Sequence, residues 1–172
     1  MIDALEEVKR YIIKNNFILV GGMAIDLALR SKGSSLYKDN TLADYDFITY
    51  NFNNDAYNIA KILKNKFPDA NVDIVNAGHA STLRVFINSQ EAADITYIPE
   101  SVYDKIPTFK YNGFRVVHPH YQVIDQHVAL GLPYVNRFRE TILGRWEKDM
   151  KRHNLITKIF PSILPNFTCR VR

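Results

Sequence analysis

Apolar residues recur along this chain with two different spacings, and the order of the two predicts both helices and strands. Helical spacing covers residues 3–14, 23–30, 54–66, 121–130 and 135–153. Short runs rich in β-branched and aromatic residues predict strands at residues 17–20, 44–50, 72–75, 82–87, 92–97 and 114–117. Helices and strands alternate at first and strands then cluster. We therefore expect an α+β fold, in which one mixed β-sheet is covered mainly on one face by helices.

Composition narrows the class of protein that this pattern can describe. The chain has 172 residues, of which 47% are hydrophobic and 23% are charged, as in folded globular proteins. It contains no apolar run long enough to cross a membrane, and its first residues lack the apolar core of a secretory signal. A single cysteine, Cys169, excludes an internal disulfide and favours a reducing compartment. We therefore expect one compact cytoplasmic protein with no membrane partner.

The positive charge is concentrated at one end of the sequence. Residues 136–172 carry nine Lys and Arg against three Asp and Glu, whereas residues 1–135 carry 13 against 15. We therefore divide the chain into a core, 1–135, and a basic helix and tail, 136–172, which belong to the same unit or begin a further domain. A basic segment of this kind favours contact with a polyanion, although a solvated helix face gives the same count.

The last predicted helix carries two stripes. Arg145, Lys148 and Arg152 share one face and predict contact with nucleotide phosphates or an RNA backbone, with a solvated face as the alternative. The apolar positions have helical spacing and are assigned to the core rather than to a base-stacking surface. They are Val135, Phe138, Ile142, Trp146 and Met150.

Three aspartates and a pair of glycines form the strongest candidate site. Asp44 and Asp46 project to one side of an extended strand, and Asp94 lies in a later strand. Close carboxylates repel unless a cation lies between them, so the three predict a site for two Mg²⁺ or Mn²⁺ ions. Gly21 and Gly22, between a strand and a buried helix, would let backbone N–H groups approach a phosphate. Each feature alone is more often structural, but together they occur in the order that nucleotide chemistry requires.

Other polar residues have less decisive patterns. We interpret Asp26 as the solvated position of an apolar helix, although it could instead hold the metal-binding loop. Asp73 competes with Asp94 as the third carboxylate, and Arg84 is either a triphosphate contact or a surface residue. His118 and His120 are separated by a proline and lack a cysteine pair, so a zinc site is not expected.

The motif resembles that of the DNA polymerase β-like nucleotidyltransferases, in which an apolar residue, two small residues, Asp-x-Asp and a distant aspartate follow in order. The matching residues are Val20, Gly21, Gly22, Asp44, Asp46 and Asp94. Within that superfamily the chain looks like the catalytic subunits of poxvirus and giant-virus poly(A) polymerases. That closer resemblance rests on residues 21–27, 44–47, His79, 82–84, 93–99 and 145–152. The resemblance favours Asp94 over Asp73 as the third carboxylate. Where many relatives have serine, this chain has Gly22, so only backbone donors remain there.

The resemblance implies a mixed-sheet nucleotidyltransferase core at residues 1–135 and a role in mRNA processing. The implied reaction is template-independent transfer of AMP from ATP to RNA 3′ ends, with Asp44, Asp46 and Asp94 as ligands of two metal ions. Gly21, Gly22, Arg84 and the basic stripe would bind the nucleotide. A viral enzyme of this kind would act in the infected cell's cytoplasm or in the virion, as a homodimer or with a processivity subunit. Its relatives are longer, so we expect a downstream RNA-cradling domain to be absent from this sequence, as in a fragment, a split-gene product or a reduced homologue.

Two alternatives stay open from the sequence. One is nucleotidyl transfer to a small molecule, a tRNA or a protein. The other is a non-catalytic or incomplete subunit that binds nucleotide or RNA, which would bind RNA with a steep salt dependence without extending it.

Overall fold

The secondary structure comes from a computed structural model that describes residues 1–78, 81–132 and 142–161. The strands are β1 (Ile18–Val20), β2 (Tyr45–Thr49), β3 (Val72–Asn76), β4 (Thr82–Ile87), β5 (Gln90–Tyr97), β6 (Thr108–Tyr111) and β7 (Phe114–Val117). The helices are α1 (Ile2–Lys14), α2 (Gly21–Arg30), α3 (Phe52–Lys66), α4 (Glu100–Tyr103), α5 (Pro119–Gly131) and α6 (Ile142–Ile159).

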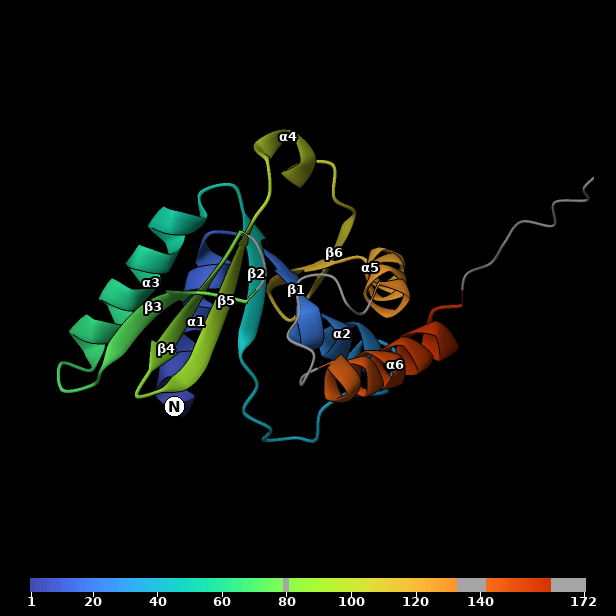
Figure 1. The fold of residues 1–172 in the computed structure, drawn as a ribbon, viewed down its shortest axis with the longest axis horizontal. Helices are drawn as coiled ribbons and strands as arrows, with labels where there is room; N and C mark the ends of the chain where they lie inside the picture. Colours follow the sequence, from blue (N-terminus) through green and yellow to red (C-terminus); the bar gives the residue numbers. More distant parts are fainter. Residues whose placement is uncertain (79–80, 133–141, 162–172) are drawn as a thin grey trace, which may run out of the picture.

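The strands form one sheet in the order β3-β4-β5-β2-β1-β7-β6 (Figure 1). The pairs β2/β5 and β1/β7 are parallel, and the other neighbours are antiparallel. The α+β class and the mixed sheet predicted from the sequence are therefore confirmed. The parallel pair β2/β5 matters most for function, because it places two widely separated segments of the sequence side by side.

Two groups of helices pack against this sheet (Figure 1). Helices α1 and α3 contact each other and the strands around β2 and β5, where Ile12, Phe47 and Leu63 are fully buried in the main core. Helix α2 contacts β1, β2 and β7 and also packs against α5 and α6. This second group has a smaller core of its own, formed by Ile25, Leu29, Val123 and Ile156. Apart from the short helix α4, the helices thus form two groups. The predicted sheet covered mainly on one face describes only the group of α1 and α3.

Two elements that the pattern analysis did not predict are α4 and β6. β6 and β7 form a hairpin whose two-residue turn, Asn112-Gly113, has positive φ at both positions. Asn-Gly is a strong signal for such a turn, so the sequence did contain the information. β4 and β5 also form a hairpin, with Asn88 and Ser89 at positive φ.

The last helix differs from its prediction. The described helix α6 extends to Ile159, beyond the predicted end at residue 153. Trp146, assigned to the core, is 38% exposed, because α6 is anchored to α2 and α5 through Ile156 further along the helix. Val135 and Phe138 lie outside the described residues, as does the predicted boundary at residue 135. None of the described helices is long and apolar enough to span a membrane.

Candidate functional site

A row of charged side chains crosses the middle of the sheet. Asp46 on β2 lies directly opposite Asp94 on the parallel strand β5, and Asp94 lies opposite Arg84 on β4. Residues in register on neighbouring strands share a face of the sheet, so the three side chains project together. Asp44 precedes β2, which begins one residue later than the pattern predicted. The sheet therefore brings two of the three predicted metal ligands together by direct register.

Asp46 is held in an environment that opposes its negative charge. Its pKa is raised to about 7, first by burial and then by the nearby carboxylates of Asp44 and Asp94. The guanidinium of Arg152 and a backbone hydrogen bond from Gly22 act in the opposite direction. A cation at this point would relieve the repulsion between the carboxylates.

Asp94 is already paired with a cationic side chain. Its carboxylate is 5% exposed and accepts two hydrogen bonds of 2.6 Å from Arg84, one from Nε and one from Nη2. Arg84 Nη1 donates to Glu91 at 2.6 Å, and these two acidic partners raise the pKa of the guanidinium. The structure thus places Arg84, predicted as a triphosphate contact or a surface residue, in a bidentate pair with the third carboxylate.

The first glycine of the pair allows the sheet and helix α2 to approach closely. Gly21 has φ +67°, in the left-handed region that favours glycine, and it begins α2 directly after β1. A Cβ at this position would overlap the carboxylate of Asp46. Any other residue would therefore push Asp46 away from the helix N-terminus.

The second glycine leaves room for two side chains from distant parts of the chain. A Cβ on Gly22 would overlap the hydroxyl of Tyr37 and lie 2.5 Å from Nη2 of Arg152. Arg152 Nη2 donates to Tyr37 Oη at 3.1 Å, and Arg152 Nη1 lies 3.9 Å from Asp149 Oδ1. The space beside Gly22 is thus filled by a tyrosine hydroxyl and an arginine.

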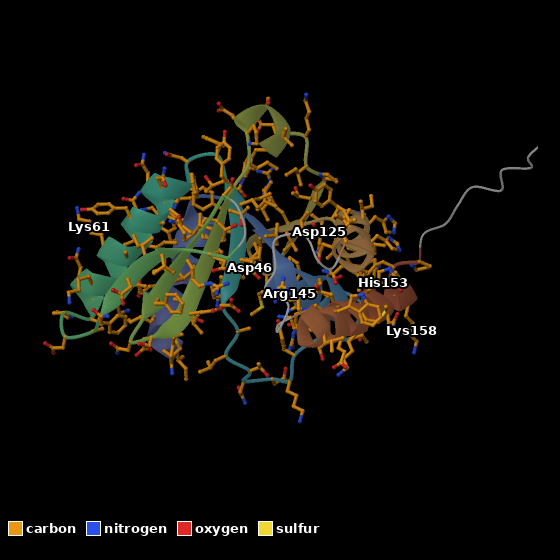
Figure 2. The ribbon with its side chains drawn as sticks, in the orientation of Figure 1. Asp46, Lys61, Asp125, Arg145, His153 and Lys158 are labelled. Atoms are coloured by element: carbon orange, nitrogen blue, oxygen red, sulfur yellow. The ribbon has the colours of Figure 1, made fainter. Side chains whose placement is uncertain are left out.

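The aspartates open into a cleft of about 540 Å³, a volume typical of small-molecule sites. The sheet forms one wall, and the other is formed by α5 and α6, with Arg145, Lys148 and Arg152 among the lining residues. Figure 2 shows Asp46, Arg145 and Asp125 around this space. Burial, and then the neighbouring Arg152 and Arg145, lower the pKa of Lys148. An acidic wall therefore faces a basic one, as a metal-bound polyphosphate requires.

The interpretation of Asp26 as a solvated residue is wrong. Its side chain is 3% exposed and accepts backbone hydrogen bonds from Leu36 and Tyr37 at 2.7 and 2.9 Å. Arg30 Nε also donates to it, at 2.5 Å. Asp26 therefore fixes the loop that carries Tyr37. The interpretation failed because the loop that buries this carboxylate lies ten residues further along the chain.

Two of the remaining candidates, Asp73 and His118, do not line the cleft. Asp73 is exposed on the edge strand β3 and does not line the cleft. His118 is the N-cap of α5 and accepts a hydrogen bond from the backbone of His120 at 3.3 Å. His79 lies outside the described residues.

Sequence reasoning missed several residues that line or support the cleft. They are Tyr37, which braces Arg152, and the α5 residues Tyr121, Gln122, Asp125 and Gln126, which line the cleft. No motif identifies them, because a loop residue and one face of a helix acquire this role only when α5 and α6 pack beside the sheet.

The carboxylates suit a divalent cation in chemistry, although they are not yet arranged as a complete ligand set. Across the described ranges, no group of three or more His, Cys, Asp or Glu is positioned to hold a metal ion. The reason is visible at Asp94, whose two oxygens both face Arg84. Mg²⁺ and Mn²⁺ nevertheless prefer oxygen ligands. The raised pKa of Asp46 reflects in part the repulsion from the neighbouring carboxylates, which such an ion would offset.

The mixed sheet, the glycine turn before α2 and the row of aspartates define a nucleotidyltransferase fold. The structure superposes on that of Megavirus polyadenylate synthase with a TM-score of 0.82 and 26% identity, over 98% of this chain and 33% of that chain. The sequence model of the family "Poly(A) polymerase catalytic subunit" matches residues 6–136, and the chain belongs to this family.

Two curated viral proteins show the extent of the relationship. A protein of African swine fever virus, which carries the provisional name poly(A) polymerase catalytic subunit, is 42% identical over 158 residues, or 92% of this chain and 33% of its own length. A protein of Acanthamoeba polyphaga mimivirus with the same provisional name is 28% identical over 159 residues, or 91% of this chain and 26% of its own. The chain thus spans about a third or less of the length of these relatives.

Proposed function

We propose that this chain forms the catalytic core of an enzyme that transfers AMP from ATP to the 3′ hydroxyl of RNA. In this reaction the 3′ oxygen attacks the α-phosphorus, the bond to the β-phosphate breaks, and pyrophosphate leaves while the hydroxyl proton passes to solvent. The observation that carries the proposal is the register of Asp46 and Asp94 across β2 and β5, facing a cleft whose opposite wall is cationic.

The carboxylates and the cationic wall have separate roles. Asp44, Asp46 and Asp94 would hold two Mg²⁺ or Mn²⁺ ions, which lower the pKa of the attacking hydroxyl and offset charge on the leaving group. When Asp94 holds a metal ion, Arg84 would release the two carboxylate oxygens of Asp94. The metal ions would thus place positive charge next to the oxygens on which negative charge develops in the reaction.

The phosphates of ATP would lie between the helix α2 terminus and helix α6. Backbone N–H groups at Gly21 and Gly22 would contact the triphosphate, since neither carries a side chain that blocks the approach. Arg145, Lys148 and Arg152 line the cleft and would bind the phosphates or the RNA backbone.

An RNA extension assay with labelled ATP tests this function. We expect incorporation of AMP that requires Mg²⁺ or Mn²⁺ and falls about 1,000-fold or more in the double variant Asp44→Ala, Asp46→Ala. Asp73→Ala is the matched control, because Asp73 is an exposed aspartate of the same sheet outside the cleft. Incorporation that survives the double substitution would remove the mechanism.

The length of the relatives favours a second candidate, in which this chain binds nucleotide or RNA and depends on further protein for transfer. The same preparation distinguishes the two. If the chain binds ATP and RNA but incorporates nothing alone, adding a second subunit or the longer relative's remaining segment should restore extension. Offering tRNA, a small hydroxylated acceptor and a protein under the same conditions identifies the acceptor. Light scattering tests the expected assembly into a dimer.

A further inference from the structure

Two buried glutamines in the cleft have acceptor oxygens that nothing in the described structure satisfies. Gln122 and Gln126 on α5 are 4% and 8% exposed, and both line the cleft. Among the described residues, Oε1 of each side chain has no hydrogen-bond donor. The great majority of buried polar atoms in folded proteins have a partner, so two unsatisfied oxygens on one helix require an explanation.

The orientation of Gln122 is fixed by its neighbour. Its Nε2 donates to the backbone carbonyl of Val117 at 3.0 Å. A carbonyl oxygen only accepts hydrogen bonds, so the amide nitrogen must face it and Oε1 must face the other way. Gln122 therefore carries an unsatisfied acceptor oxygen on the side away from Val117.

Gln126 lies one helical turn further along the same face of α5. Side chains four residues apart on a helix are neighbours, so both glutamine side chains border the same part of the cleft. Apolar side chains of Ile25 and Val117 line the same cleft and are each 1% exposed. A flat apolar ring with a donor group at its edge fits these surroundings.

We infer that Gln122 and Gln126 bind the exocyclic amino group of adenine and thereby favour ATP over GTP and UTP. The 6-amino group of adenine carries two N–H donors, one for each glutamine oxygen. Guanine and uracil present a carbonyl oxygen at the corresponding position, which would face two acceptors without a hydrogen. A site built for a donor rejects a ligand that lacks one more strongly than it rejects a small change of shape.

The inference rests on the proposed function, because that function requires a nucleoside triphosphate in this cleft. The phosphates would lie between the aspartates and the cationic side chains of α6, and the base would extend toward α5. Gln122 and Gln126 are then residues of substrate specificity, distinct from those that hold metal or phosphate.

Equilibrium binding to the full chain, without RNA, tests the inference independently of catalysis. With Mg²⁺ present, we expect ATP to bind about tenfold more tightly than purine riboside 5′-triphosphate, which lacks only the 6-amino group. ITP, with an oxygen at that position, should bind at least as weakly. Equal affinities for ATP and purine riboside triphosphate would overturn the inference, and that comparison needs only the unaltered protein.

Variants locate the effect at the two glutamines. Gln122→Met and Gln126→Met preserve an unbranched side chain of similar size, and each should reduce the tenfold preference to about twofold. Gln90→Met is the matched control, since Gln90 is exposed at the start of β5, and it should keep the preference. If both variants keep the preference for ATP over purine riboside triphosphate, the inference is contradicted. It is also contradicted if the wild type discriminates against 2′-deoxy-ATP and the variants do not, because the glutamines would then bind the ribose.

The outcome separates this inference from the proposed function. If ATP binds with the expected preference but no AMP enters RNA, the transferase proposal fails and the base site stands. If RNA is extended equally with ATP and with purine riboside triphosphate, the transferase stands and the base site fails.

Discussion

Two carboxylates of this protein have opposite electrostatic environments in the fold. Asp55, at the start of α3, is 6% exposed and accepts hydrogen bonds of 2.8 Å from both the hydroxyl of Tyr11 and that of Thr49. Asp46, on β2, faces two further carboxylates in the cleft, and its pKa is raised to about 7. The first side chain has the partners it needs, whereas the second lacks a cation.

The contrast extends to the regions around the two residues. Among the described residues, no buried polar side-chain atom between α1, α3 and the sheet lacks a hydrogen-bond partner. The cleft instead holds repelling aspartates, clustered cations and two glutamine oxygens without donors. Unsatisfied polar groups lower stability, so their concentration in one cleft indicates where a ligand binds.

The largest expected effect comes from removing the repulsion in the cleft. In the metal-free chain, Asp46→Asn should raise the free energy of unfolding at pH 7 by about 2–4 kcal/mol, while metal and nucleotide binding are lost. The native pKa lies above the ordinary value, so the wild-type chain loses stability as pH rises from about 4 to 7. The advantage of the variant should therefore grow over that range and level off above it. Urea unfolding with a chelator, across pH 4–8, measures this, and a pH-independent difference would contradict it.

The opposite result is expected in the core. Asp55→Ala should lower the free energy of unfolding by about 2–3 kcal/mol, because the hydroxyls of Tyr11 and Thr49 both lose their acceptor. ATP affinity of the folded protein should stay within about twofold of the wild type. Denaturant unfolding and calorimetric titration provide the two measurements. A large loss of affinity at unchanged stability would show that the two regions are coupled.

Removing the arginine that pairs with Asp94 should destabilise only the metal-free protein. Arg84→Gln leaves Asp94 and Glu91 without their cation, and we expect a loss of about 1–2 kcal/mol, or several degrees in melting temperature. Mn²⁺ together with ATP should recover most of that loss, since it supplies positive charge at the same carboxylate. Arg115→Gln, which changes an arginine outside the cleft, should show no such recovery.

The smallest effect is expected at the second glycine. Gly22→Ala should weaken ATP binding by about fivefold, because the added methyl group overlaps the Tyr37 hydroxyl and displaces Arg152. Combining it with Tyr37→Phe removes the overlapping oxygen and should recover part of the affinity. Gly131→Ala is the control, since a Cβ there meets open space. If the double variant binds ATP more weakly than Gly22→Ala does, the hydrogen bond between the Tyr37 hydroxyl and Arg152 contributes more to ATP affinity than the overlap with the hydroxyl costs.

The site was predictable as far as local spacing and strand order reach. Asp46 and Asp94 each occupy a strand position that faces the same side of the sheet, and the parallel pairing of β2 and β5 sets them opposite each other. The basic stripe on α6 follows from helical spacing, and its residues line the cleft. Such patterns can be recognised in the sequence because the side-chain orientation of each residue depends mainly on the helix or strand that contains it.

Partners that come from distant segments could not be predicted in this way. Asp26 was misinterpreted because its donors belong to the loop at Leu36 and Tyr37. Arg84 could be assigned to Asp94 only once β4 and β5 were paired in register. Each case depends on where another part of the chain comes to lie.

The sequence by itself determined the α+β class, most of the helices and strands, and the aspartate and glycine motif, because side-chain period and turn chemistry are local properties. Only the tertiary structure decided which charges meet, that Arg84 neutralises Asp94, and that two glutamines of α5 beside the cleft have buried oxygens without donors. Hydrogen bonds and electrostatic interactions depend on distance in space, and packing alone brings those groups together.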